Sequence, residues 1–291
     1  MKTFTQSVAT QIPGTGYPRI TTLFCDFDGP IVDVSDRYHR TYRLGLAHAR
    51  RHYRQQGEIL PLSPLSKSQF WHLKQNRVPD GEIALRSGLQ DEQIDYFRTQ
   101  VEQWVNHPSL LRCDRLQPGV PWALSLFQQQ GIRLVIVTLR TEEQVRELLE
   151  RNHLQDHFAA IYGTACEDLA YANYAEVKTV LLKKALAEQI ELAEHIAAEA
   201  TIAETIAETI ADPSAQQSTD RLGAGALPAA FAMVGDTEAD VLAAQAVGIP
   251  VVALTCGIRS EAYLQGLAPD HLESNLLLFA HRLRCFFCPQ S

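Results

Sequence analysis

The chain has 291 residues, of which 46% are hydrophobic and 21% charged, and its formal net charge is −8. The apolar fraction is too high for a disordered chain, the acidic balance argues against a general binder of nucleic acid or anionic membranes, and six cysteines are too few for a disulfide scaffold. Because the sequence shows neither a membrane-length apolar run nor an apolar leader, we expect a soluble, cytoplasmic globular protein of one or two domains.

The first part of the chain contains three kinds of segment: a polar tail, a short strand and a run of helices. Residues 1–19 are polar and rich in turn formers, so we expect an N-terminal tail there. Residues 20–27 predict a short buried strand that ends at an Asp-Gly-Pro turn. The next segment predicts helices alone, with Ser35 and Asp91 as N-caps of the first and last long ones. These helices are expected at 36–56, 66–75, 81–85 and 91–105.

From about residue 118 onward, strands and helices alternate. Strands are expected at 133–137, 158–162, 231–234 and 250–254, and helices at 120–130, 141–152, from about 175, at 237–247 and in the C-terminal segment. This alternation predicts an α/β fold, a doubly wound, Rossmann-like parallel sheet. Residues 20–33 and 116–291 would form this core, and the helical residues 34–115 would form an inserted domain.

The segment 188–226 interrupts this alternation of strands and helices. It contains a repeated Thr-Ile-Ala-Glu tetrad that places Ile202, Ile206 and Ile210 on one helical face. A low-complexity surface helix followed by a flexible return loop explains the pattern. The isoleucine stripe could instead contact a partner or a second copy of the chain, and the oligomeric state stays open.

Residues 24–29, Phe-Cys-Asp-Phe-Asp-Gly, carry the strongest chemical signal. Side chains two positions apart on an extended segment point the same way, so Asp26 and Asp28 can both face the crevice at the carboxyl end of the strand. Two carboxylates this close repel each other unless a cation or a shared proton relieves them. The plainer alternative is a simple Asp-Gly turn, in which Asp28 has no chemical role.

Residues 231–240 repeat this arrangement. An apolar strand leads into Gly235 and Asp236, and Asp240 follows four residues later. Asp236 could simply cap the next helix. Three or four carboxylates gathered from two strand ends would nevertheless form a hard-oxygen site suited to Mg²⁺.

Two weaker signals lie between these acidic motifs. Thr138 follows the strand at 133–137, and a hydroxyl with free backbone N–H groups at a helix start can bind an anion. An ordinary N-cap explains Thr138 equally well. Lys178 begins a helical run, although a surface position is the default for any single lysine.

Taken together and in this order, the motifs resemble those of the haloacid dehalogenase (HAD) superfamily, in its branch of capped phosphoglycolate phosphatases and β-phosphoglucomutases. The resemblance runs from about residue 21 to the segment 257–260 and omits the tetrad repeat. It departs from the usual pattern at Pro30 and in the residue after Lys178, which is not proline. The resemblance implies a HAD-like α/β core with residues 34–115 as an α-helical cap domain. The matching residues are Asp26, Asp28, Thr138, Lys178, Asp236 and Asp240.

The resemblance also implies an activity, a Mg²⁺-dependent phosphatase acting on a small phosphate monoester. Asp26 would be the nucleophile that forms an aspartyl-phosphate, and Asp28 would protonate the leaving oxygen and then deprotonate the attacking water. Mg²⁺ would be held by Asp26, the backbone carbonyl of Asp28 and Asp236, with Asp240 as a further ligand or an orienting residue. The residues expected to bind the phosphate are Thr138 and Lys178.

The predicted helix at 36–56 is unusually basic. We expect its arginines to form a solvated face opposite an aromatic one. Some of them, chiefly Arg40 and Arg43, could instead bind an anionic group of the substrate, as could Arg140 beside Thr138. The arginines of this helix are Arg37, Arg40, Arg43, Arg50, Arg51 and Arg54.

Two other functions stay open on the sequence. A phosphomutase of the β-phosphoglucomutase type would keep all the motifs, and a non-catalytic scaffold could bind an acidic partner or RNA through the basic helix. The complete set of acids argues against the scaffold, so we expect a small phosphorylated metabolite as partner and neither nucleic acid nor membrane. Cys285 and Cys288 could form a redox pair or half of a zinc site, although two reduced thiols on a terminal helix explain them more simply.

Overall fold

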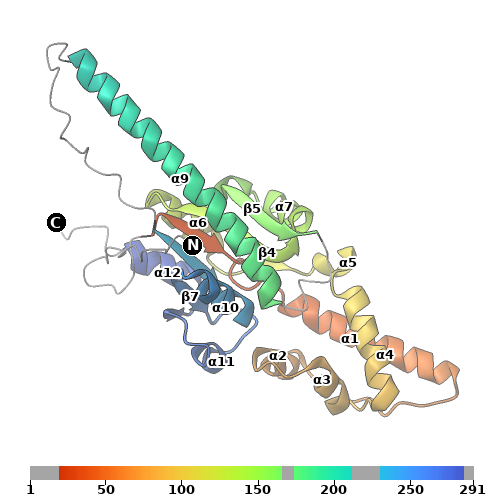
Figure 1. Cartoon of the computed structure of the whole chain (residues 1–291). Coiled ribbons are helices and arrows are strands. Elements are labelled where there is room, and N and C mark those ends of the chain that lie inside the picture. Colours follow the sequence, from red (N-terminus) through yellow and green to blue (C-terminus); the bar gives the residue numbers. More distant parts are fainter. Residues whose placement is uncertain (1–19, 166–173, 212–229, 285–291) are drawn as a thin grey trace.

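The computed structural model describes residues 20–165, 174–211 and 230–284, and a six-stranded sheet lies at its centre (Figure 1). The strand order is β5-β4-β1-β6-β7-β8, and every neighbouring pair is parallel. The strands are β1 (Thr22–Cys25), β4 (Arg133–Thr141), β5 (Ala160–Thr164), β6 (Phe231–Gly235), β7 (Val251–Leu254) and β8 (His271–Glu273). The chain crosses from β1 to its neighbours on either side, so the carboxyl ends of β1, β4 and β6 meet in the middle of the sheet.

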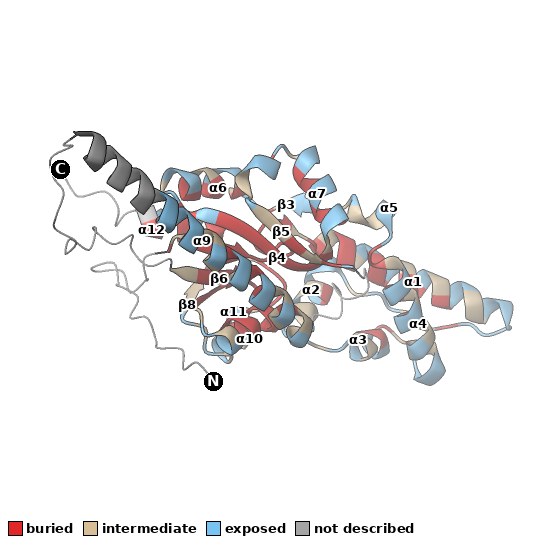
Figure 2. Cartoon of the chain, turned by 45° about the horizontal axis from the view of Figure 1, so that its top comes forward, coloured by how far each residue is buried: buried red, intermediate tan, exposed pale blue. Residues whose placement is uncertain are grey.

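Helices cover both faces of this sheet, because successive strand residues point to opposite sides. Phe24 of β1 packs in an apolar cluster with Leu182 and Val241, whereas Leu23 belongs to a second cluster that includes Phe127. Figure 2 shows the buried strands between the two helical layers. The doubly wound α/β prediction is therefore confirmed. The first face is covered by α9 (Ala175–Ala211) and α10 (Glu238–Val247), the second by α6 (Val120–Gln129), α7 (Glu142–Arg151) and α12 (Leu276–Arg284).

The helical insertion lies beyond the edge of the sheet at which these strands end (Figure 1). It consists of α1 (Ser35–Gln55), α2 (Lys67–Gln75), α3 (Asp80–Arg86), α4 (Asp91–Trp104) and α5 (Pro108–Leu111). Gly45 lets α1 and α4 approach closely, since a Cβ atom there would lie 2.9 Å from the ring of Phe97. The ring of Tyr42 stacks on Phe70 with centroids 4.8 Å apart, and both rings belong to the same apolar cluster as Leu23 of the sheet.

A two-stranded ribbon joins the insertion to the sheet. β2 (Val32–Asp33) and β3 (Arg115–Leu116) pair antiparallel, with Val32 opposite Leu116 and Asp33 opposite Arg115. The chain therefore leaves the core and returns to it side by side. This pairing was not predicted, because two-residue strands have no periodicity to detect.

Several predicted boundaries need correction. Ser35 is the first residue of α1 and its N-cap is Val34, which makes no side-chain capping bond. Asp91 likewise begins α4, and a capping box centred on Gln90 precedes it. The strand predicted at 133–137 continues to Thr141, whose side chain accepts a hydrogen bond from Gln144 and caps α7. The C-terminal helices are α11 (Glu261–Gln265) and α12, whereas the 3₁₀ turn at Gln155–His157 and strand β8 between these helices were not predicted.

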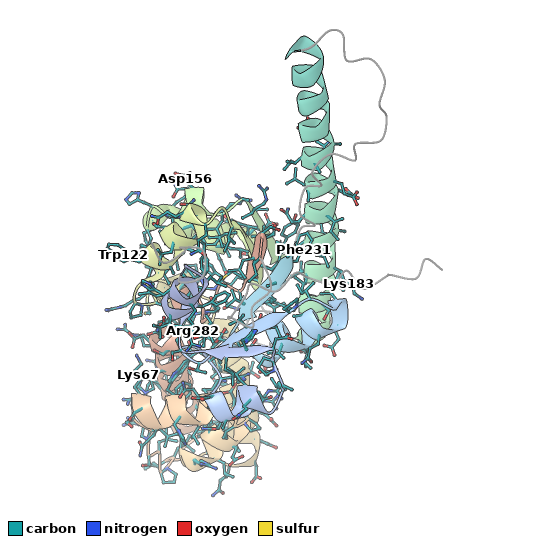
Figure 3. All side chains as sticks on the ribbon, turned by 90° about the vertical axis from the view of Figure 1, so that its left-hand side faces the viewer. Lys67, Trp122, Asp156, Lys183, Phe231 and Arg282 are labelled. Carbon is teal, nitrogen blue, oxygen red and sulfur yellow. The ribbon has the colours of Figure 1, made fainter. Side chains whose placement is uncertain are left out.

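The long helix α9 contains the tetrad repeat and extends well past the sheet, as Figure 1 and the perpendicular view of Figure 3 both show. The return segment at 212–226, the predicted tail at 1–19, and Cys285 and Cys288 lie outside the described residues. None of the helices in the described part of the chain combines the length and hydropathy that a membrane span requires.

Candidate active site

The motifs predicted from the sequence meet at the carboxyl ends of the three central strands. Asp26 follows β1, Thr138 lies near the end of β4, Asp236 follows β6, and Lys178 lies in the first turn of α9. The strand register explains the meeting, because Cys25 pairs with Ile136 on one side and with Val234 on the other, which brings the next residues of all three strands level. Asp26, Asp28, Thr138 and Lys178 line one small cavity of about 40 Å³.

Lys178 links the two acidic motifs. Its side chain is buried, and Nζ lies 2.7 Å from Asp26 Oδ1 and 2.8 Å from Asp240 Oδ1. Burial and the nearby Asp240 raise the pKa of Asp26 to about 7, although Lys178 acts in the opposite direction. Burial alone would lower the pKa of Lys178, but the two carboxylates raise it above its ordinary value. The ammonium group therefore stays charged and offsets part of the negative charge of the site.

Asp240 is held by its own loop. Its Oδ2 accepts hydrogen bonds from the backbone N–H groups of Asp236 and Thr237, at 3.1 and 3.0 Å, and from the Thr237 hydroxyl at 2.8 Å. Thr237 and Asp240 thereby form the capping box of α10. The sequence alternative in which Asp236 caps this helix is wrong, and the Asp236 side chain is left for another role.

Asp236 is completely buried, and it is surrounded by backbone. Its Oδ2 accepts a hydrogen bond from the Ile258 N–H, whereas its Oδ1 has no hydrogen-bond partner within the described residues. A Cβ atom at Gly29 or at Gly257 would lie 2.0 Å from this carboxylate, so only glycine fits at either position. Burial, together with Asp26 and Asp240, raises the pKa of Asp236 well above its ordinary value.

The residues present fit a divalent cation. Asp26, Asp236 and Asp240 each offer a carboxylate oxygen, and these atoms lie within 4.8 Å of one another. Within the described residues Asp236 Oδ1 is buried without a hydrogen-bond partner, and the raised pKa values of Asp26 and Asp236 are expected where positive charge is lacking. A set of hard oxygen donors suits Mg²⁺.

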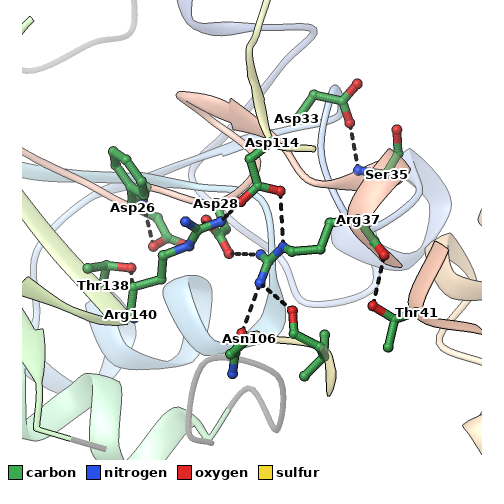
Figure 4. Close-up of polar contacts among 12 residues, drawn as sticks. Asp26, Asp28, Asp33, Ser35, Arg37, Thr41, Asn106, Asp114, Thr138 and Arg140 are labelled. Atoms are coloured by element: carbon green, nitrogen blue, oxygen red, sulfur yellow. Dashed lines mark hydrogen bonds and ion pairs between the residues drawn. The ribbon is translucent and has the colours of Figure 1, made fainter. Parts of the chain in front are cut away.

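Asp28 belongs to a second buried cluster, the arginine–aspartate quartet of Asp28, Arg37, Asp114 and Arg140 (Figure 4). Arg37 donates from Nη2 to Asp28 Oδ2 at 2.9 Å and from Nε to Asp114 Oδ1 at 3.0 Å. Arg140 Nε lies 2.7 Å from Asp28 Oδ1, and Arg140 Nη2 donates to Asp114 Oδ2. Burial raises the pKa of Asp114 against the lowering effect of both arginines. Each arginine thus joins both aspartates, and the four side chains form a closed ring.

The predicted anion-binding residues have different positions. Thr138 is buried in the wall of the small cavity, and its hydroxyl accepts the Arg140 N–H at 3.2 Å. Arg140 also lines this cavity, although its guanidinium is engaged by the quartet. Arg40 and Arg43 are exposed on α1 and are not among the residues that line this cavity or the larger one beside it. The structure therefore does not bring them to the site.

The insertion supplies the outer wall of the site. Tyr38 and Lys74 line the small cavity, and Lys74 with Arg259 also borders a larger one of about 1130 Å³ between the insertion and the core. Glu238 fastens the two sides together, since Arg259 donates to it at 2.6 and 2.9 Å and Arg77 of the insertion donates to it as well. Burial acts in the opposite direction, but the hydrogen bond from Arg259 lowers the pKa of Glu238 to about 2.

A profile of haloacid dehalogenase-like hydrolases matches residues 23–168, half of the chain, and a second profile, of HAD-hydrolase-like sequences, matches residues 211–277. The chain belongs to the haloacid dehalogenase-like hydrolase family. The resemblance seen in the sequence is therefore confirmed. The comparison with curated proteins gave no match.

Solved structures of HAD-like proteins share the fold. A haloacid dehalogenase-like hydrolase from Streptococcus pneumoniae is 18% identical, with a TM-score of 0.55 over 92% of this chain and 99% of that one. A predicted phosphatase from Clostridium acetobutylicum is 14% identical, with a TM-score of 0.53 over 91% of this chain and 98% of that one. A predicted phosphoglycolate phosphatase from Haemophilus somnus 129PT is 16% identical, with a TM-score of 0.53 over 90% of this chain and 97% of that one.

The sequence analysis missed several residues at this HAD-like site. Arg37 was expected on a solvated face of α1, but it is buried, because its helix begins directly over Asp28. Asp114 carries no sequence signal, since its partners are 77 and 26 positions away. Lys74 and Arg259 come from opposite sides of the larger cavity and meet only in the folded chain.

Proposed function

We propose that this HAD-like hydrolase removes the phosphoryl group from a small phosphate monoester through an aspartyl-phosphate on Asp26. The observation that carries the proposal is the placement of the Asp26 carboxylate, which lies buried at the meeting of three strand ends with Lys178 at 2.7 Å and Asp28 two residues away. A buried carboxylate beside a fixed cation is suited to act as a nucleophile. The family assignment and the phosphatase named among the similar structures support this reaction class.

The nucleophilic atom would be Asp26 Oδ2. Within the described residues, the Phe27 N–H at 2.7 Å and the Lys178 ammonium group at 2.7 Å both contact Oδ1 of this carboxylate. Oδ1 is thereby fixed in place, and Oδ2 would attack the phosphorus atom in line with the departing oxygen. The positive charge of Lys178 would offset the negative charge of the Asp26 carboxylate and of the phosphoryl oxygens. Thr138 would donate a hydrogen bond to one of those oxygens.

Asp28 would carry the proton. As the bond between phosphorus and the ester oxygen breaks, the proton of Asp28 would pass to the departing oxygen. In the second step Asp28 would take a proton from water while that water attacks the aspartyl-phosphate, which returns Asp26 and Asp28 to their initial states.

Mg²⁺ fits this proposal as the cofactor. Asp26, Asp236 and the backbone carbonyl of Asp28 would hold it, and Asp240, anchored by the capping box, would orient the site or serve as a further ligand. Bound there, the ion would offset the negative charge of the carboxylates and of the phosphoryl group.

The two cavities indicate how a substrate would be accommodated. The small cavity of about 40 Å³ has room for little more than the transferred phosphoryl group. The adjoining cavity of about 1130 Å³, bordered by the insertion, would receive the rest of the molecule, so that residues 34–115 act as a cap domain. One similar structure is described as a predicted phosphoglycolate phosphatase, which supports a small phosphorylated metabolite as substrate.

The test is phosphate release from p-nitrophenyl phosphate and a panel of small phosphate esters, with and without Mg²⁺. Asp26→Asn should abolish turnover while circular dichroism stays unchanged. Asp95→Asn, which changes an exposed carboxylate on α4, is the control and should retain wild-type turnover. Wild-type rates in Asp26→Asn, or no phosphate release by the wild-type protein from any ester, would refute the proposal.

A further inference from the structure

The arginine–aspartate quartet contains two buried charges, Arg37 and Asp114, for which the proposed reaction has no direct use. Arg37 is 1% exposed and Asp114 is 4% exposed. A buried ion pair is poor evidence of stabilisation, because the desolvation of both partners offsets much of their attraction. Because Asp28 is itself a member of this ring of four buried charges, the other members can act on the reaction through it.

The guanidinium of Arg37 is fixed on all sides. Besides its bonds to Asp28 and Asp114, Nη1 donates to Asn106 Oδ1 at 2.9 Å and to the Val105 carbonyl at 3.3 Å. A planar guanidinium bonded through all three nitrogens has one orientation. Asp28 therefore faces a donor that has no freedom to turn away.

The β2–β3 ribbon brings the four residues of the quartet together. Arg37 lies in the first turn of α1, directly after β2, and Asp114 immediately precedes β3. Since β2 and β3 are paired, the two residues enter the quartet from adjacent strands of the chain, while Asp28 and Arg140 enter it from the core. The quartet therefore spans the junction between insertion and sheet.

The two oxygens of Asp28 are bound differently. Oδ2 accepts a hydrogen bond from Arg37 Nη2 at 2.9 Å. Oδ1 lies 2.7 Å from Arg140 Nε, but the two atoms are not aligned for a hydrogen bond, and within the described residues Oδ1 has no hydrogen-bond partner at all. Both oxygens of Asp28 are therefore held in the ring, Oδ2 by a hydrogen bond and Oδ1 by an ion pair, and the residue forms part of the wall of the small cavity.

We propose that Arg37 is a positioning residue that fixes the orientation of the Asp28 carboxylate at the wall of the small cavity, where Asp28 exchanges the proton with the ester oxygen. This inference rests on the proposed phosphatase function. As Asp26 forms its bond to phosphorus and the ester bond breaks, the electron pair of that bond goes to the departing oxygen, which takes the proton from Asp28. Asp114 holds Arg37 and Arg140 at their fixed separation on the other side of the ring.

The experiment compares two esters that differ in their need for a proton. The dinitrophenolate released from 2,4-dinitrophenyl phosphate is a stable anion and leaves readily without a proton. The phenolate released from phenyl phosphate is a poorer leaving group and needs a proton. General acid catalysis contributes about 10²–10⁴-fold, so Arg37→Met should lower kcat/KM for phenyl phosphate by at least about 100-fold. The same variant should lower kcat/KM for 2,4-dinitrophenyl phosphate by no more than about threefold, because its departing oxygen needs no proton. The KM values should stay close to those of the wild-type protein.

Matched variants separate positioning from folding. Arg37→Lys keeps the charge but offers a single nitrogen, so it should restore part of the activity on phenyl phosphate, and it carries the comparison if Arg37→Met fails to fold. Arg86→Met removes an exposed arginine of the same insertion and should behave as wild type with both esters.

The outcomes are distinct. An equal fall for both esters in Arg37→Met and in Arg37→Lys would overturn the inference, since a merely structural role weakens both reactions alike. If the wild-type protein hydrolyses neither ester nor any other phosphate monoester, the proposed function itself fails. If the wild-type protein hydrolyses both esters and the Arg37 variants have the same kcat/KM values as the wild type, only the role of Arg37 is refuted.

Discussion

Gly257→Ala tests whether the position of the Asp236 carboxylate controls the site. Gly257 follows β7 and has no unusual backbone angle, so the effect of the substitution is steric. A Cβ atom there would lie 2.0 Å from Asp236 Oδ2, 2.4 Å from Cγ and 2.6 Å from Cβ. Because the Cβ atom of Asp236 is itself in the way, rotation of its side chain cannot relieve the clash, and the backbone must move.

The size of the effect follows from these distances. Carbon contacts are comfortable at about 3.5 Å or more, so the Asp236 side chain and the new methyl group must separate by more than about 1 Å. A displacement of about 1 Å at a catalytic group costs on the order of 100-fold in rate, and overpacking costs about 1–3 kcal/mol in stability. The hydrogen bond from the Ile258 N–H to Asp236 Oδ2 would be broken in the same movement.

The assay measures kcat/KM for p-nitrophenyl phosphate against Mg²⁺ concentration, together with urea unfolding. We expect the rate of Gly257→Ala to fall about 100-fold and its Mg²⁺ requirement to rise. Gly266→Ala is the control, because its φ of −63° suits any residue and its Cβ atom would lie 3.3 Å from the nearest atom, the Tyr263 carbonyl oxygen. A folded Gly257→Ala protein with wild-type rate and Mg²⁺ dependence would refute the reasoning.

Two further substitutions test the buried contacts. Lys178→Met leaves Asp26 and Asp240 without their cation and should cost about 3–5 kcal/mol in urea unfolding without metal. Mg²⁺ should restore more stability to this variant than to the wild type, and an identical response of both proteins would contradict a metal site among these acids. Tyr42→Phe removes the hydroxyl that accepts the Leu65 N–H at 2.8 Å and bonds Ser87 Oγ at 2.7 Å. We expect the free energy of unfolding of Tyr42→Phe to fall by about 1–3 kcal/mol while kcat is retained. A loss of activity at unchanged stability would contradict this structural role of the hydroxyl.

The sheet and its acidic motifs could be predicted because their signals are local. A short apolar run that ends in charged residues marks both the strand and the edge at which it ends, so Asp26 and Asp236 could be assigned to one edge before any contact was known. The parallel register then brings them level, as the alternation of strands and helices requires. Thr138 and Lys178 depended on the family resemblance, because a hydroxyl or a lysine near a helix start is common everywhere.

The quartet could not be predicted, because its members are defined by long-range partners. Helical periodicity indicates which residues of α1 share a face, but it does not reveal that Asp28 and Asp114 cover Arg37 in the first turn while Arg40 and Arg43 stay exposed. Arg37 is therefore buried although Arg40, one turn later, is exposed. The same limit applies to Arg259, whose bonds to Glu238 depend on how the loop after β7 folds back onto α10.

The β2–β3 ribbon has a consequence for how such a chain can change over generations. Val32 and Leu116 are paired neighbours, so the residues between them begin and end about one strand spacing apart, roughly 4.8 Å. A gap of that size can be closed by a two-residue turn or by an inserted segment of almost any length without altering the register of the sheet. The inserted segment can therefore change in length or sequence without moving the strand ends that carry Asp26, Thr138 and Asp236.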